Sequence, residues 1–128
     1  MTFTLSIRDE TTAGERLDET VLDFLTERIT VRELIRSRVY QEVQDYNVGK
    51  NSRFRGLVQP LETERQLNPA ERREVDWKHQ FEVAQEAFQR NGFLILVGDR
   101  QVEHLDDEIL IEPSTQVSFV RLVPLAGG

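Results

Sequence analysis

The chain has 128 residues, of which 38% are hydrophobic and 30% charged, and its formal net charge is -7. This length suits one domain that buries about two-thirds of its unfolded surface, and the negative charge argues against a nucleic-acid partner. No apolar run reaches the roughly 18 residues of a membrane span, and the first residues lack the charged and apolar regions of a signal peptide. With no cysteine, the sequence offers no disulfide and no thiol nucleophile. We therefore expect a cytoplasmic protein that binds neither nucleic acid nor membrane.

The first residues predict a β-hairpin. Apolar and polar residues alternate over Thr2–Arg8, which is the pattern of a half-buried strand. Residues 9–15 contain two threonines and a glycine and predict the hairpin loop. A second strand is expected over Arg16–Phe24.

A capped helix follows the hairpin. Thr30 and Glu33 have the spacing of a capping box, in which Thr30 is the N-cap and Glu33 is the third helical residue. Apolar residues then recur at helical spacing, and we expect a helix over Val31–Asp45. The predicted inward stripe is Val31, Leu34, Ile35, Val39 and Val43. The residues expected outside this stripe are Arg32, Arg36, Arg38 and Glu42.

Residues 47–92 predict an insertion that carries a second helix. Its first part is polar, with a short strand expected at Phe54–Val58. Asn68, Pro69 and Glu71 predict the start of a helix over Pro69–Arg90, and Asn91-Gly92 predicts its end. The apolar stripe of this helix is Trp77, Phe81, Ala84 and Phe88. We expect the stripe to pack against the domain, or else against a second copy of the chain.

The C-terminal part predicts further strands. Phe93–Val97 is short and continuously apolar, which favours a central strand buried on both faces. Gly98-Asp99 and Asp106-Asp107 predict turns, and Pro113-Ser114 predicts another. The expected strands between and after these turns are Arg100–Leu105 and Gln116–Val123, and Ile109–Ile111 is expected to pack as an apolar segment between them. The sequence then ends in Gly127-Gly128.

This order of elements resembles the β-grasp fold of ubiquitin-like proteins. The resemblance rests on the hairpin with its capped helix at residues 30–34, on residues 95–102, on residues 107–117, and on the Leu125-Ala126-Gly127-Gly128 ending. The ending is similar to those of the sulfur carriers of thiamine and molybdopterin synthesis. The long insertion, and Pro124 and Ala126 in place of the arginines that precede Gly-Gly in ubiquitin, resemble bacterial ubiquitin-like modifiers encoded beside conjugation enzymes.

The resemblance implies an α+β fold, with a mixed sheet crossed by one helix and an inserted second helix. The terminal strands should be parallel and adjacent. Residues 1–123 should form a single ubiquitin-like domain, with 47–92 as its insertion, and residues 124–128 a flexible diglycine tail.

The resemblance also implies the function of a protein modifier. An activating enzyme would adenylate the Gly128 carboxylate with ATP and magnesium, and the chain would then be transferred to a target protein. A conjugating enzyme and a zinc isopeptidase are further partners that the resemblance implies. The chain itself would be a substrate, not an enzyme, with no intrinsic cofactor. Two alternatives stay open, namely a sulfur carrier with a terminal thiocarboxylate and an interaction module that is never conjugated.

The expected site lies at the end of the chain. Gly127 and Gly128 lack a side chain and fit a narrow channel, while Pro124 stiffens the approach. Leu125 and Ala126 complete the segment that docks to the partner. Strand alternation offers Val120 and Leu122 as an exposed apolar patch, and the opposite register would bury them.

No metal site is expected. The two histidines, His79 and His104, are isolated in the sequence, and the acidic run Asp106-Asp107-Glu108 is more simply a solvated turn. The inserted helix remains a candidate surface for self-association.

Overall fold

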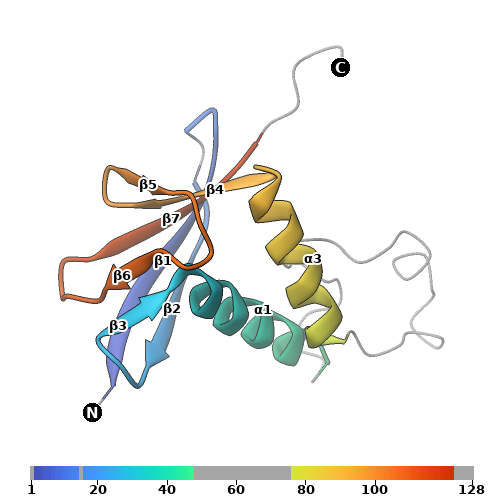
Figure 1. Ribbon diagram of the computed structural model, residues 1–128, viewed down its shortest axis with the longest axis horizontal. Coiled ribbons are helices and arrows are strands. Elements are labelled where there is room, and N and C mark those ends of the chain that lie inside the picture. Colours follow the sequence, from blue (N-terminus) through green and yellow to red (C-terminus); the bar gives the residue numbers. More distant parts are fainter. Residues whose placement is uncertain (1, 15, 48–75, 123–128) are drawn as a thin grey trace. The chain divides into compact units, whose positions relative to one another are not determined.

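The computed structural model describes residues 2–14, 16–47 and 76–122 (Figure 1). The chain divides into two compact units, Met1–Leu34 with Ala87–Gly128 and Ile35–Glu86, so that both helices contribute to both units. The elements in chain order are β1 (Phe3–Thr11), β2 (Arg16–Phe24), β3 (Arg28–Thr30), α1 (Val31–Asn47), α3 (Trp77–Gln89), β4 (Phe93–Val97), β5 (Arg100–Val102), β6 (Glu108–Leu110) and β7 (Gln116–Arg121).

Five strands of the first unit form a mixed sheet in the order β2-β1-β7-β4-β5 (Figure 1). The first and last strands, β1 and β7, are parallel and place Ile7 beside Val117. The other three pairings are antiparallel. The predicted α+β class is therefore confirmed, as is the predicted pairing of the terminal strands.

Alternation along the strands puts the apolar residues of one sheet face into the core. Leu5 and Ile7 of β1 are buried, and so are Val117 and Phe119 of β7. The register places Phe119 beside Ile95 of β4. Because each of these side chains leaves water almost completely, each contributes about 1.5–3 kcal/mol of transfer free energy.

Several predicted strands differ from the observed ones. β5 ends at Val102, not at Leu105, and β7 ends at Arg121, not at Val123. The first strand was expected to end at Arg8, but β1 continues to Thr11 because its pairing with β7 extends to that residue.

Phe93–Val97 was expected to be a central strand buried on both faces. β4 is an interior strand, paired with β7 and with the short edge strand β5, but only one of its faces is well buried. Leu94 and Leu96 are accordingly only partly buried. A continuous apolar run therefore did not require burial on both faces.

A small antiparallel pair, β3 with β6, was not predicted from the sequence. It places Ile29 beside Ile109, and both side chains are buried. The strands have three residues each, which is too short for a clear alternation pattern.

The capped helix begins where the sequence predicts. The Glu33 N–H donates to Thr30 Oγ1 at 3.2 Å, and the Thr30 hydroxyl donates to Glu33 Oε1 at 3.3 Å. The helix ends at Asn47, two residues later than expected. All five residues of the predicted stripe are buried. Arg38 was expected outside the stripe but is 7% exposed, and it forms an ion pair with Glu42 one turn later.

The second helix begins later than the sequence predicts. Asp76 caps α3, since its carboxylate accepts from the Lys78 N–H at 3.0 Å and its carbonyl accepts from the Gln80 N–H at 3.1 Å. A helix running without interruption from Pro69 is therefore wrong. The predicted cap residues before Asp76, and the strand predicted at Phe54–Val58, lie outside the described residues.

The predicted end of this helix is confirmed. Asn91 has a positive φ of 60°, the left-handed conformation that commonly ends helices. The Asn91 N–H donates to the Phe88 carbonyl at 3.0 Å, and the Gly92 N–H donates to the Ala87 carbonyl at 2.7 Å. These two bonds form the Schellman motif, which satisfies carbonyls that have no partner within the helix.

The stripe of α3 is buried toward its C-terminal end. Ala84 and Phe88 are 0% and 4% exposed, whereas Trp77 and Phe81 are partly exposed. Within the second unit, the Trp77 ring meets the edge of Tyr40 at a centroid distance of 5.3 Å. The stripe thus has a partner on its own chain at Trp77, and self-association through α3 stays a prediction.

The central position of Phe119 predicts a large stability loss on its truncation. Phe119 is 0% exposed and stacks on Phe93 at a centroid distance of 5.9 Å. Phe119→Ala should lower the free energy of unfolding by about 3–5 kcal/mol, because the cavity adds to the lost transfer term. Leu25→Ala is the control, since Leu25 is 83% exposed, and it should change stability by less than about 0.5 kcal/mol. Urea unfolding measures both, and similar losses in the two variants would contradict the assigned core.

Candidate functional site

The predicted conjugation site lies at the C-terminal end of the chain. Residues 123–128, which include Pro124, Leu125, Ala126, Gly127 and Gly128, lie outside the described residues. Val120 and Leu122 are described, as is all of β7. The structure therefore positions the base from which the predicted tail departs.

That base is held on both sides by neighbouring strands. Arg121, the last residue of β7, pairs with Thr11 of β1 and with Phe93 of β4. The Thr12 N–H also donates to the Arg121 carbonyl at 3.1 Å. Moving the backbone at Arg121 would break ladders on both sides, and each broken bond would leave unpaired polar groups. The chain thus leaves the sheet from its middle strand at a fixed point.

A part-buried ion pair lies at the same end of the sheet. Asp9 is 8% exposed, and its Oδ2 lies 3.7 Å from Arg121 Nη2. A carboxylate withdrawn from water needs such a partner. The sequence-based interpretation put Asp9 in the hairpin loop and missed this contact. The sequence could have indicated that Asp9 faces inward, because Asp9 takes the next inward position after Leu5 and Ile7 in the alternation of β1.

The two described docking candidates differ in exposure. Val120 lies on the sheet face opposite Phe119, as one of the two predicted registers requires, and Leu122 follows the last residue of β7. Leu122 is 45% exposed and accessible to a partner. Val120 is only 8% exposed, and its cross-strand neighbours are Glu10 and Leu94. Val120 therefore acts mainly as support within this face, and Leu122 offers the exposed apolar surface.

The apolar character of this face continues onto β4. Leu94 pairs with Val120, and the partly buried Leu96 pairs with Ser118. Together with Val120, these leucines form an apolar strip on β4 and β7, and the exposed Leu122 follows β7 directly.

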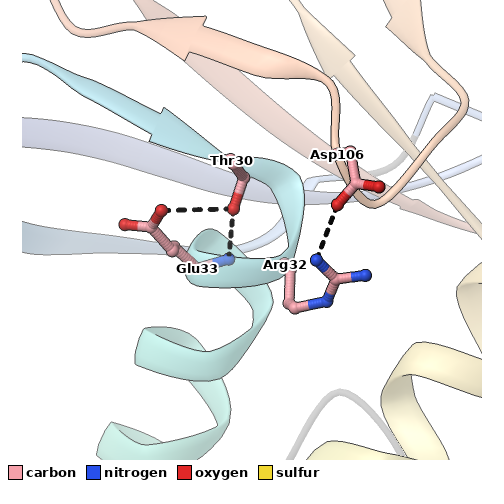
Figure 2. Close-up of polar contacts among 4 residues, drawn as sticks. All are labelled: Thr30, Arg32, Glu33 and Asp106. Carbon is pink, nitrogen blue, oxygen red and sulfur yellow. Dashed lines mark hydrogen bonds and ion pairs between the residues drawn. The ribbon is translucent and has the colours of Figure 1, made fainter.

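The acidic turn at residues 106–108 uses its carboxylates in structural contacts. Asp106 Oδ1 accepts from Arg32 Nη1 at 2.6 Å (Figure 2). Glu108 Oε2 lies 3.7 Å from Arg28 Nη1. The third carboxylate, of Asp107, accepts the backbone N–H groups of Glu103 and His104 at 3.0 and 3.1 Å. A solvated turn, the simpler of the two sequence interpretations, fits these contacts.

The turn also forms hydrogen bonds with the start of α1. The Val31 N–H donates to the Asp107 carbonyl at 2.9 Å, and the Arg32 N–H donates to the Leu105 carbonyl at 3.0 Å. With the Glu33 N–H bonded to Thr30 (Figure 2), three of the four N–H groups that a helix start leaves unpaired have partners. The turn is thereby a structural support for the helix.

Backbone hydrogen bonds favour the ionised form of Asp107. The Glu103 N–H and then the His104 N–H stabilise the ionised carboxylate, and they hold the pKa of Asp107 below its usual value.

Both histidines of the chain, His79 and His104, are exposed. Over residues 2–14, 16–47 and 76–122, no group of three or more His, Cys, Asp and Glu residues could hold a metal ion.

No family model matches the sequence, and neither a curated protein nor a solved structure matches it significantly. Among the helices of the described residues, none combines the length and apolar character needed to cross a bilayer.

The hydrogen bonds of Asp107 predict a pH-dependent contribution to stability. Because its pKa is lowered on folding, the contribution is present above the unfolded-state pKa of about 3.9 and is lost as the pH falls through the folded-state pKa. Asp107→Asn should therefore destabilise the protein at about pH 7, and the difference from wild type should shrink below about pH 4. Urea unfolding across this range measures the effect.

The control is Asp99→Asn, the same change at an exposed turn residue. If this variant showed the same change with pH as Asp107→Asn, the effect would not belong to the hydrogen bonds of Asp107. A difference between wild type and Asp107→Asn that stays constant down to about pH 3 would show that the Asp107 charge does not matter.

Proposed function

We propose that this chain is a ubiquitin-like protein modifier with a β-grasp fold. A partner activating enzyme adenylates its Gly128 carboxylate, and the chain is then transferred to a target protein. The observation that carries the proposal is the parallel pairing of β1 and β7 in the middle of the sheet, followed along the sequence by Gly127-Gly128.

The arrangement of elements supports the fold part of the proposal. An antiparallel β1–β2 hairpin leads through the short β3 into a capped helix, and the last strand returns beside the first. Ubiquitin-like proteins combine these features. The insertion at 47–92 distinguishes this chain from the minimal members of that family.

The tail sequence supports the chemical part. Seven residues, 122–128, follow the last paired residue of β7, and a fully extended chain of this length reaches at most about 25 Å. Pro124 fixes its own φ and favours an extended residue before it. Gly127 and Gly128 present no side chain to the walls of a narrow channel.

Activation divides the transfer into two steps. A Gly128 carboxylate oxygen attacks the α-phosphorus of ATP, so that an acyl adenylate forms and pyrophosphate leaves. A nucleophile, on the enzyme or on the target, then attacks the Gly128 carbonyl carbon, and AMP leaves with the bonding electron pair. ATP and magnesium belong to the partner, and this chain supplies only the electrophile.

The apolar strip on β4 and β7 supplies a docking surface for the activating enzyme. Leu122 is exposed and comes directly before the tail, while Leu94 and Leu96 extend the surface away from it. Leu125 and Ala126 would enter the channel with the diglycine. A conjugating enzyme and a zinc isopeptidase would use the same end of the molecule.

The proposal predicts that activation depends on the last two residues. With the cognate activating enzyme, ATP and magnesium, the chain ending at Gly128 should support ATP–pyrophosphate exchange. Deletion of Gly128, or Gly127→Phe, should abolish exchange because the carboxylate is misplaced or the channel is blocked. Both variants should keep the wild-type Tm, since the proposal puts the tail outside the core.

Ser114→Phe is the matched control for added bulk. Ser114 is exposed in the turn before β7, at the opposite end of that strand from the tail, and its variant should exchange like wild type. The product then separates the alternatives: an ester or amide on another protein supports the modifier, and a terminal thiocarboxylate supports a sulfur carrier. Exchange by the Gly128 deletion at the wild-type rate would leave the unconjugated interaction module as the better description.

A further inference from the structure

We propose that the outer edge of β2 is a second interaction surface, which binds an extended cationic segment of another protein as an additional strand. Among the described strands, β2 pairs only with β1 and ends the sheet on that side (Figure 1). It is nine residues long, whereas the opposite edge strand, β5, has three. An edge of this length presents a row of backbone donors and acceptors that another strand can pair with.

The side chains of β2 show which strand would fit. Val21 is 60% exposed and pairs with Ser6, which puts it on the face opposite the buried Leu5. Glu19 and Asp23 lie two residues to either side of Val21, on the same face, and both are exposed. An apolar residue therefore lies between two carboxylates in the middle of the open edge.

The two carboxylates are oriented by neighbours on β1. Asp23 Oδ1 accepts from the Thr4 hydroxyl at 2.7 Å, and Glu19 Oε1 accepts from the Ser6 hydroxyl at 3.5 Å. A carboxylate has further acceptor positions beyond one such bond. Both groups can therefore take a bond from a cation on an added strand.

This charge pattern is selective. Natural edge strands are commonly protected by lysine, other charges, proline or a β-bulge. Arg16–Phe24 has no lysine or proline, and the register shift of β2 lies at its start, opposite Asp9 and Glu10, away from Val21. Two copies of β2 paired antiparallel about Val21 would place Glu19 opposite Asp23, and like charges in that position are unfavourable. The acids thus oppose self-pairing and acidic strands, while they favour a strand with a cation at each matching position.

The expected partner segment follows from this register. It has a β-branched apolar residue opposite Val21, and an arginine or lysine two positions to each side, opposite Glu19 and Asp23. Leu25 is 83% exposed directly after β2 and extends the apolar contact. Because β1 lies between β2 and β7, this surface is separate from the base of the tail and does not depend on the proposed conjugation.

The first experiment uses a short synthetic peptide with valine at its centre, arginine two positions to each side, and threonine elsewhere. NMR titration should shift the amide signals of β2 preferentially. The same peptide with glutamate for arginine, and a scrambled peptide of equal composition, should bind at least about tenfold more weakly, because the two opposite-charge pairs are lost. Equal binding of the scrambled peptide, or shifts centred on β4 and β7, would overturn the proposal.

A second pair of peptides tests strand pairing directly. N-methylation of alternate residues removes backbone donors on one side of an extended peptide only. One of the two alternating sets should abolish binding and the other should preserve it. If the two methylated peptides bind equally well, the peptide binds by charge alone without pairing as a strand, and the proposal is wrong.

A charge reversal tests the side-chain assignment. The double variant Glu19→Arg with Asp23→Arg should no longer bind the cationic peptide and should bind the glutamate peptide. An unfolded variant cannot show this exchange of preference. Glu103→Arg with Glu112→Arg is the matched control, since it makes the same change in net charge at two exposed residues outside β2. If both double variants lost affinity for the cationic peptide equally, overall net charge would explain the binding, and the proposal would be wrong.

Discussion

The parallel pairing of β1 with β7 is the constraint on which the rest of the first unit depends. Parallel neighbours cannot be joined by a tight turn, so the chain between them must cross from one end of the sheet to the other. In the sequence, all other elements come between these two strands, beginning with β2, which forms a hairpin with β1. The pairing also places Ile7 beside Val117 and Asp9 beside Phe119, which aligns the inward residues of both strands on one face. The same pairing sets the point where the chain leaves β7.

A second constraint joins the start of α1 to the turn before β6. The turn carbonyls of Leu105 and Asp107 accept the first two helical N–H groups, and Thr30 accepts the third. The carboxylate of Asp107 in turn holds the backbone of the turn. A residue far along the chain therefore helps to set where the helix begins. The capping box was readable from the sequence, but its connection to residues 103–107 was not, because it depends on a contact distant in sequence.

The features that were predicted correctly are those that depend on neighbouring residues in the sequence. The alternation of β1, the bounds of β2 and β4, the cap at Thr30 and the left-handed stop at Asn91 all follow from neighbours in the sequence. The errors arise where tertiary pairing decides. β1 is longer than its clearest alternation because β7 pairs with it as far as Thr11. Arg38 is buried because Glu42 compensates its charge, which a simple apolar pattern does not register.

The candidate site was predictable to different degrees. The alternation of β7 put Val120 on the face opposite Phe119, as the register has it, whereas Leu122 follows the last residue of the strand. It did not give their exposures, because the covering of Val120 depends on which strands lie beside β7. The contact of Asp9 with Arg121 was missed for a similar reason, since it joins two strands that are adjacent in space and distant in sequence. The β2 edge is visible only once the order of strands is known.

The central claim is most directly tested by backbone NOEs between β1 and β7. Because the two strands are parallel and in the stated register, cross-peaks should connect the backbone protons around Ile7 with those around Val117, and those around Asp9 with those around Phe119. These contacts should appear together with the antiparallel pattern between β1 and β2. If β1 shows NOEs to β2 alone, or an antiparallel pattern to β7, then β7 does not lie between β1 and β4, and the account of the fold and of the tail's departure is wrong.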